Sequence, residues 1–255
     1  MGHESLACHY VHSGPRHSIE AADILRRSMP AGSGVVTMAG ATLLISSKNY
    51  SSWSLRGYLL VRLAGLAFEE RVVDPDDPTN RKELLLQSSS IRVPALMHDD
   101  VVIWDTLAIA EYLNETFPHA QMLPSERVAR ARCRSVSGEM HSGFSAMREA
   151  LPMNLRLYRP GFAVWSAVQE DIDRITEIWR ECLATWKGPW LFGARPTVAD
   201  AMYAPVVTRF RSYDVKMDKV CERYCQQIMA WPDMKEWFAE AQREPEQIDE
   251  LDIEF

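Results

Sequence analysis

Residues 42–65 read TLLISSKNYSSWSLRGYLLVRLAG, and this stretch decides the fold of the first half of the chain. The short apolar run Thr42–Ser46 is bounded by polar residues and predicts a strand. A leucine then recurs every four residues, which predicts a helix over Ser51–Ala64. Gly65 is a typical residue for ending such a helix, because glycine adopts the left-handed conformation without steric cost.

The chain up to residue 118 continues this alternation of strands and helices. Phe68–Val73 predicts a second strand, and a hairpin is expected from Val93–Met97 and Val101–Ile103. Arg81–Leu86 predicts a short helix, and Asp105–Phe117 predicts a longer one. The resulting order is β-α-β-α-β-β-α. Its first half is a βαβ unit, for which we expect parallel strands and a right-handed crossover.

After residue 124 the strand patterns stop and helical spacing takes over. Apolar residues recur at helical intervals from residue 128 to 147 and from 172 to 186, and further helices are expected over Thr197–Tyr213 and Trp231–Gln242. Six of the eight tryptophans lie in this half, which indicates a well-filled core. The expected fold class is therefore α/β plus all-α, with an α/β domain over residues 41–118 and an all-helical domain over residues 125–242.

Residues 1–40 follow neither pattern. They hold five glycines and four of the seven histidines, and they have no sustained periodicity, so we expect a flexible N-terminal extension. The His and Cys residues of this segment match no standard zinc spacing, and no metal site is expected.

Composition narrows the class of protein. Hydrophobic residues make up 47% of the 255 residues and charged residues 25%, which is typical of a globular protein. The net charge is −7 without a basic block, so no nucleic-acid partner is expected. Five cysteines are too few for a disulfide scaffold and favour a reducing compartment. No apolar run reaches the length of about 18 residues that would suggest a membrane span, and we expect a cytoplasmic protein.

Three positions place polar groups at the start of a helix or strand. Ser51 and Ser52 open the first helix, where free N–H groups favour an anion such as a thiolate, although helix capping alone also explains serine there. Pro94 opens a strand, and a cis bond before it would leave the backbone of Val93 free for a peptide-like ligand. Asp105 opens another helix, either as a cap or as part of a site for a carboxylate.

Two other features have a structural interpretation. Thr197 followed three residues later by Asp200 resembles a capping box. His141 is a lone histidine, which we interpret as a core or surface residue rather than a base.

The order and spacing of these motifs resemble the soluble glutathione transferase family, over residues 41 to about 241. The resemblance is carried by Ser51-Ser52-Trp53-Ser54-Leu55-Arg56, which is similar to the S-S-C-x-W-R stretch of zeta-class members, by Val93-Pro94-Ala95-Leu96, by Asp105-Thr106, and by Leu191-Phe192-Gly193 with Thr197-x-Ala199-Asp200. Trp53 stands where the zeta class has cysteine, and Leu55 where it has tryptophan. This weakens an assignment as a cis–trans isomerase, and the chain resembles bacterial serine-type transferases more closely.

The resemblance implies a thioredoxin-like N-terminal domain, an all-helical C-terminal domain and a binding site for glutathione. By the family's pattern, Ser51 would stabilise the glutathione thiolate, with Ser52 as the alternative. The glutathione-binding residues would be Arg92 for the glycyl carboxylate, Val93 and Pro94 for the cysteinyl backbone, and Asp105 and Thr106 for the γ-glutamyl group. The electrophile pocket would use Trp53, Met140, Phe144 and Met147, although helix packing also explains this stripe.

The expected function is that of a glutathione S-transferase, which activates the thiolate for attack on a hydrophobic electrophile, as in detoxification. Glutathione is then a co-substrate and no cofactor is needed. The alternatives are a non-catalytic module for binding or regulation, and a glutathione-dependent isomerase or peroxidase. The family pattern also implies a homodimer, with contacts through the helix before Pro118 and the helix ending near Met147.

Overall fold

A computed structural model describes residues 40–73 and 92–245, all of which belong to one compact unit. The expected N-terminal extension and the expected helix Arg81–Leu86 lie outside the described residues.

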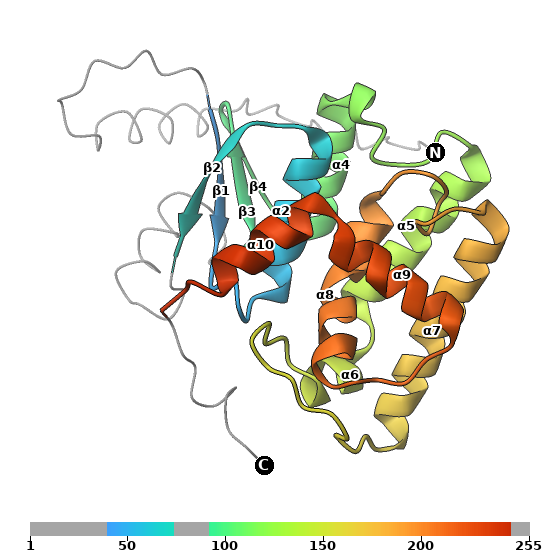
Figure 1. The fold of residues 1–255 in the computed structure, drawn as a ribbon. Helices are drawn as coiled ribbons and strands as arrows, with labels where there is room; N and C mark the ends of the chain where they lie inside the picture. Colours follow the sequence, from blue (N-terminus) through green and yellow to red (C-terminus); the bar gives the residue numbers. More distant parts are fainter. Residues whose placement is uncertain (1–39, 74–91, 246–255) are drawn as a thin grey trace, which may run out of the picture. The chain divides into compact units, whose positions relative to one another are not determined.

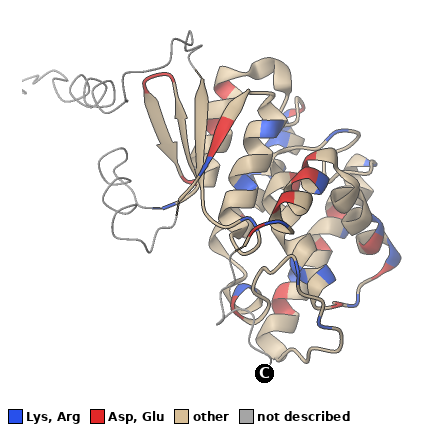
Figure 2. Cartoon of the chain, turned by 60° about the vertical axis from the view of Figure 1, so that its left-hand side comes forward, with Lys and Arg blue, Asp and Glu red and all other residues tan. Residues whose placement is uncertain are grey.

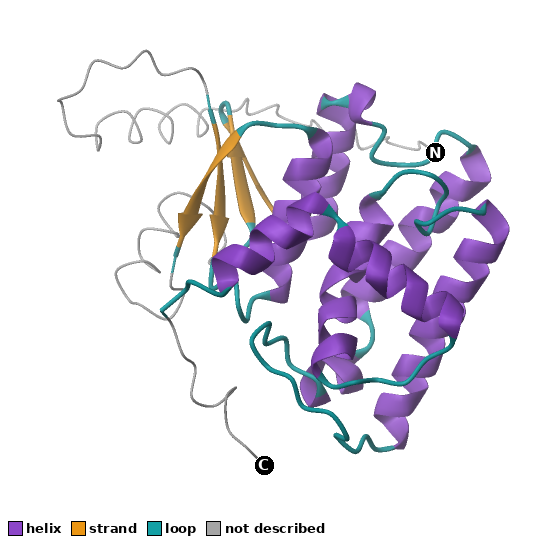
Figure 3. Ribbon diagram, in the orientation of Figure 1, coloured by secondary structure: helices purple, strands orange, loops and turns teal. Residues whose placement is uncertain are grey.

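The first half contains a mixed sheet of four strands in the order β2-β1-β3-β4. β1 (Ala41–Ile45) pairs in parallel with β2 (Phe68–Val72), as expected for a βαβ unit. β3 (Ala95–His98) pairs antiparallel with both β1 and β4 (Val101–Trp104), which confirms the hairpin. Figure 3 shows these strands side by side.

β1 is one of the two inner strands, and its apolar run follows from burial on both faces. Leu43 and Ile45 belong to the main core, which also contains the helices. Leu44, between them, packs with Val73 and Ala95 in a second, smaller cluster. Neighbouring side chains of a strand point to opposite faces, so only a fully covered strand can be apolar at every position.

Two helices, α2 (Ser52–Ala64) and α4 (Thr106–Thr116), lie on the same face of the sheet (Figure 1). Gly65 ends α2 with φ of 72°, the left-handed value expected from the sequence. Ten of the thirteen residues of α2 are buried, because α2 also contacts two helices of the second half, α8 and α10.

The second half is helical. Its helices are α5 (Arg127–Ser142), α6 (Ser145–Ala150), α7 (Ser166–Trp186), α8 (Val198–Ser212), α9 (Lys219–Ala230) and α10 (Pro232–Ala241), preceded by a 3-10 turn at Pro118–Ala120. α8 lies at the centre, with fourteen of its fifteen residues buried, and contacts α2, α5 and α9. The thioredoxin-like arrangement followed by an all-helical part is therefore confirmed.

One continuous helix ending near Met147 is wrong, because the chain breaks between α5 and α6. Gly143 ends α5, and a Cβ atom there would lie 2.8 Å from the carbonyl oxygen of Glu139. Phe144 follows with φ of 60°, a left-handed conformation that no helix interior allows. The apolar spacing continues across the break. The spacing alone therefore does not indicate that the helix ends there.

The capping box at the start of α8 is present, and its Asp200 carboxylate also binds groups outside α8. Oδ2 of Asp200 accepts hydrogen bonds from the Thr197 backbone N–H at 2.8 Å and from the Thr197 hydroxyl at 2.9 Å. Oδ1 accepts from the Leu191 N–H at 3.0 Å and from the Tyr224 hydroxyl at 3.1 Å. Burial raises the pKa of Asp200 to about 6, while the four donors oppose that rise. One carboxylate thus joins α8 to α9 and to the preceding loop.

We expect Asp200→Ala to lower the stability of the protein by more than about 3 kcal/mol, because four donors lose a buried charged acceptor. Thr197→Ala removes only the hydroxyl and should cost about 1 kcal/mol. Urea unfolding of both variants measures the difference. Equal losses in the two variants would contradict the central role of the carboxylate.

Candidate functional site

A cavity of about 590 Å³ lies where the α/β part meets the helical part. Its lining comes from the start of α2, the entry to β3, the junction of β4 and α4, the end of α5, and α6. The lining residues are Trp53, Arg92, Val93, Pro94, Trp104, Asp105, Thr106, His141 and Arg148. The three sequence motifs from the first half therefore converge, and two helices of the second half complete the wall.

The Val93–Pro94 peptide bond is cis, as the motif suggested. Val93 precedes Ala95, the first residue of β3 that pairs with β1, so it lies at the open end of the strand. Gly57 of α2 packs directly against Pro94: a Cβ atom on Gly57 would lie 2.5 Å from the Pro94 Cβ. Glycine at position 57 therefore lets α2 approach this edge of the cavity closely.

The start of α4 combines a cap with a contact from the helical part. Asp105 has φ of 74°, and its Oδ1 accepts from the backbone N–H groups of Leu107 at 2.8 Å and Ala108 at 3.3 Å. Its Oδ2 lies 2.6 Å from Nε2 of His141, on α5. Next to it, Thr106 is buried, and its hydroxyl has no hydrogen-bond partner among the described residues.

The two serines differ in exposure and in partners. Ser51 is the N-cap of α2 and is partly exposed; its Oγ accepts from the Ser54 N–H at 3.2 Å and donates to the Ser54 Oγ at 2.8 Å. Ser52 is buried, and its Oγ accepts from Nη2 of Arg209 at 3.2 Å. Neither is among the nine lining residues, but both directly precede Trp53, which is.

The loop before Ser51 is held by the C-terminal end of the described chain. The carboxylate of Glu244 accepts from the Ser47 hydroxyl at 2.8 Å and from the backbone N–H groups of Lys48 at 2.8 Å and Asn49 at 2.9 Å. Oδ1 of Asn49 in turn accepts from the Leu155 N–H at 2.9 Å. The Glu244 contacts join residues almost 200 positions apart in the sequence. No local pattern in the sequence indicates them.

Three of the four residues expected in the electrophile pocket lie elsewhere. Met140 and Met147 are fully buried and Phe144 nearly so, all within the main core. Trp53 alone of this set lines the cavity. The correction has a simple cause: helical spacing identifies an apolar face but not whether that face covers a core or a cavity.

Sequence reasoning missed His141, Arg148 and Trp104 as lining residues. Arg148 reaches the cavity because the break at Gly143 redirects the chain after α5. His141 is neither a core residue nor a free surface residue, since it hydrogen-bonds Asp105 and lies 5.1 Å from the Trp53 ring. The glycine at position 143 was the only local signal of this arrangement.

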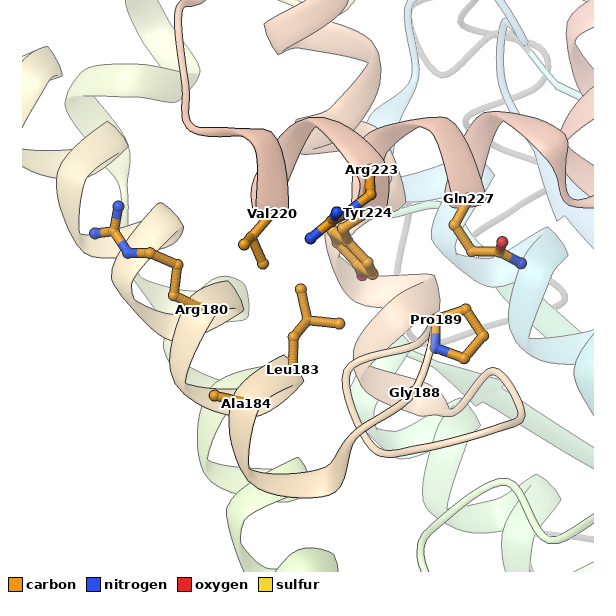
Figure 4. A pocket seen from close by; sticks show the side chains of 9 residues that line it. All are labelled: Arg180, Leu183, Ala184, Gly188, Pro189, Val220, Arg223, Tyr224 and Gln227. Atoms are coloured by element: carbon orange, nitrogen blue, oxygen red, sulfur yellow. The ribbon is translucent and has the colours of Figure 1, made fainter.

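A second cavity, of about 650 Å³, lies between α7 and α9 (Figure 4). Figure 4 shows Leu183 and Val220 pointing toward each other across it, with Arg180 and Arg223 at its sides. Arg180 pairs with Asp218 at 2.9 Å. None of the motifs singled out from the sequence reaches this cavity, so we assign the functional site to the first one.

Two features are absent from the described residues. No group of three or more His, Cys, Asp or Glu side chains in this part of the chain could hold a metal ion. None of its helices combines the length and apolar character needed to cross a membrane.

Comparison with known proteins identifies the family. Residues 50–116 match the family defined as glutathione S-transferase, N-terminal domain, and residues 155–240 match glutathione S-transferase, C-terminal domain. The chain belongs to the glutathione S-transferase family, as the motifs of the sequence suggested.

Individual relatives agree with this assignment. A probable maleylacetoacetate isomerase of Caenorhabditis elegans is 28% identical over 62% of this chain and 73% of its own length. A probable glutathione S-transferase, parA, of Nicotiana tabacum is 23% identical over 71% of this chain and 79% of its own. The crystal structure of a glutathione transferase homologue from Burkholderia, with bound glutathione, shares the fold with a TM-score of 0.62 at 23% identity, over 80% of this chain and all of that one.

We expect Gly57→Ala to destabilise the protein, although alanine is normally better than glycine in a helix by about 1 kcal/mol. The added Cβ would overlap Pro94, so α2 or the entry to β3 must move. Gly138→Ala on α5 is the matched control, because no atom lies within 4 Å of its added Cβ, and it should raise the melting temperature. A stabilised Gly57→Ala variant in thermal unfolding would refute the close contact.

Proposed function

We propose that this glutathione transferase binds glutathione along the cavity, activates its thiol at the start of α2, and joins it to an electrophile held against Trp53. In this reaction the thiol loses its proton, the sulfur forms a bond to the electrophilic carbon, and any leaving group departs with its electron pair. The observation that carries the proposal is the convergence of the Val93–Pro94 peptide, the start of α4 and Trp53 on one cavity.

The chemistry of glutathione matches these groups. A peptide can pair with the open backbone of Val93. A carboxylate can accept from the Thr106 hydroxyl, which is buried without a partner in the described chain, and from the N-terminus of α4. Asp105 offers negative charge for an ammonium group, and Arg92 lines the cavity as a partner for a second carboxylate. The family's assignments of these residues are thus chemically reasonable here.

Ser51 is our candidate for the thiolate partner, and Ser52 is the alternative. Ser51 is the more exposed of the two and lies at the N-terminus of α2, where the helix dipole favours an anion. Its hydroxyl proton, which Ser54 Oγ accepts in this structure, would turn to the sulfur when the thiolate is bound. A hydrogen bond to a thiolate lowers the pKa of the thiol, which raises the fraction of nucleophile at neutral pH. Ser52 is nearly inaccessible, but Arg209 donates to its oxygen and leaves its proton available.

We expect Ser51→Ala to reduce turnover about ten- to a hundredfold, since hydrogen bonds to charged groups contribute about 1.5–3 kcal/mol. The acidic limb of the pH–rate profile should move to higher pH, because the thiol loses a group that stabilises its ionised form. Glutathione affinity, measured by calorimetry, should change little.

Ser52→Ala is the matched control and should be milder. Loss of turnover in Ser52→Ala alone would exchange the two roles. Normal turnover in both variants would exclude a serine mechanism and leave the backbone N–H groups at the start of α2 as the stabilising groups.

An isomerase activity is the second candidate, and the similarity to a probable maleylacetoacetate isomerase favours it. Trp53 replaces the zeta-class cysteine and argues against it. Glutathione-dependent cis–trans isomerisation of maleylacetoacetate, followed by absorbance, separates the two activities. A non-catalytic role would require that no electrophile, peroxide or isomerisable substrate is turned over by a chain that still binds glutathione.

The proposal includes the domain division at residues 41–118 and 125–242, a cytoplasmic role in detoxification, and a homodimer. α4 and α5 would contribute to the dimer contact. The Arg134–Glu111 ion pair, at 2.7 Å, places these helices side by side. Val128 at the start of α5 is 62% exposed, as expected for an apolar residue that a second subunit could cover.

Sedimentation equilibrium at micromolar concentration should therefore give twice the chain mass of 29.1 kDa. Val128→Glu should shift the equilibrium toward the monomer, because a charge would be buried at an apolar contact. A wild-type protein that sediments only as the 29.1 kDa species would reject the dimer.

A further inference from the structure

Three arginines from three different helices surround Trp53 and Ser52. Arg56 of α2 and Arg209 of α8 are buried, and Arg148 of α6 is partly buried. The guanidinium carbons of Arg56 and Arg148 lie 4.5 and 4.6 Å from the centre of the Trp53 ring. Elsewhere on the described helices, Lys and Arg are interspersed with Asp and Glu (Figure 2). Around Trp53, no carboxylate in the described part of the chain pairs with any of the three.

In two of these arginines, the guanidinium N–H groups donate hydrogen bonds to other groups inside the protein. Arg56 donates from Nε to the carbonyl of Met202 at 2.8 Å and from Nη1 to the carbonyl of Ser52 at 3.3 Å. Arg209 donates to the carbonyls of Leu151 and Arg148 and to the Ser52 hydroxyl. Both guanidinium groups are therefore held inside the protein by these hydrogen bonds, and a ligand does not reach them.

Arg148 differs, because it lines the cavity and has donors to spare. Its Nη1 donates to the carbonyls of His141 at 3.2 Å and Gly143 at 3.4 Å. Its Nε and Nη2 make no hydrogen bond to any described residue. The two carbonyls fix the orientation of the planar group, and a fixed guanidinium with free donors is suited to bind a carboxylate through two parallel hydrogen bonds.

The unpaired positive charge is costly without a ligand. Burial, followed by repulsion from Arg148, lowers the pKa of Arg209 to about 10. Burial and repulsion from Arg209 and Arg148 also lower the pKa of Arg56. Buried charges normally occur with a partner of opposite sign, so an anion at Arg148 would offset the cost.

We propose that the electrophile joined to glutathione by this chain is an unsaturated or aromatic carboxylic acid, whose carboxylate is bound by Arg148 beside Trp53. This inference rests on the proposed function. Glutathione brings two carboxylates of its own, but the start of α4 and Arg92 provide for them. Trp53 follows Ser51 and Ser52 directly, so an acid bound in this way has its reactive carbon beside the start of α2, where the thiolate is stabilised.

The test compares two aryl chlorides of similar shape, one with a charged carboxylate and one with a neutral amide: 4-chloro-3-nitrobenzoate and 4-chloro-3-nitrobenzamide. In both reactions the glutathione sulfur bonds to the carbon that carries chlorine, and chloride leaves with the electron pair. We expect the wild-type protein to prefer the benzoate by at least about tenfold in kcat/KM, after each value is divided by the uncatalysed rate constant.

Arg148→Met should reduce kcat/KM for the benzoate about ten- to a hundredfold more than it reduces the value for the benzamide. Arg148→Lys should retain part of the preference, because lysine keeps the positive charge but lacks the two parallel N–H donors of the guanidinium group. Arg223→Met, in the second cavity, is the matched control and should change neither value. The wild-type comparison of the two substrates needs no variant, so it decides the question even if Arg148→Met folds poorly.

Four results would overturn the inference. Equal kcat/KM values for the two electrophiles in the wild-type protein would exclude recognition of the carboxylate. An equal loss for both in Arg148→Met, with a raised KM for glutathione, would show that Arg148 binds glutathione itself. If neither electrophile is turned over, calorimetry with the two S-aryl glutathione products decides: tighter binding of the carboxylate product supports the inference, and equal binding refutes it. If neither product nor glutathione binds, the proposed function itself fails, and the inference falls with it.

Discussion

The burial of α2 on nearly all its sides is the constraint on which the rest of the structure depends. One side packs on the inner strand β1 and on α4, and another on α8 and α10. Because so little of the helix is exposed, its position fixes both ends of the candidate site. Its first residues present the serines, and Gly57, one and a half turns later, packs against Pro94. A helix with one free face could move relative to the sheet, whereas this one cannot without disturbing two parts of the core.

The local elements of this arrangement could be predicted from the sequence, and the contacts between distant segments could not. The leucine spacing of α2, the left-handed Gly65 and the hairpin before Asp105 follow from propensity and turn chemistry. The Glu244 contact with the loop before Ser51 joins residues almost 200 positions apart and leaves no local trace. The Met140–Met147 stripe shows the same limit from the other direction, since its spacing was recognised correctly but left open whether its face covers a cavity or the core.

The buried charged side chains have two different kinds of surroundings. Asp200 is fully buried, but four donors surround it, and the carboxylate serves as a structural junction. Arg56 and Arg209 are also buried, yet they meet carbonyl oxygens and one hydroxyl rather than a carboxylate. Carbonyl dipoles satisfy the hydrogen bonds of a guanidinium without cancelling its charge. Positive potential is therefore retained beside Ser52 and Trp53, at one wall of the cavity.

This distribution of charge also explains why the α/β part alone would not form a complete site. Pro94, Asp105 and the serines belong to the first half, but the arginines that supply the potential come mainly from α6 and α8. His141 adds a direct link, because its ring lies 2.6 Å from the carboxylate that caps α4 and 5.1 Å from Trp53. A group on α5 thus constrains the orientation of a group on α4. The α/β half supplies the peptide edge and the helix starts, and the helical half supplies His141 and two of the three arginines around Trp53 and Ser52.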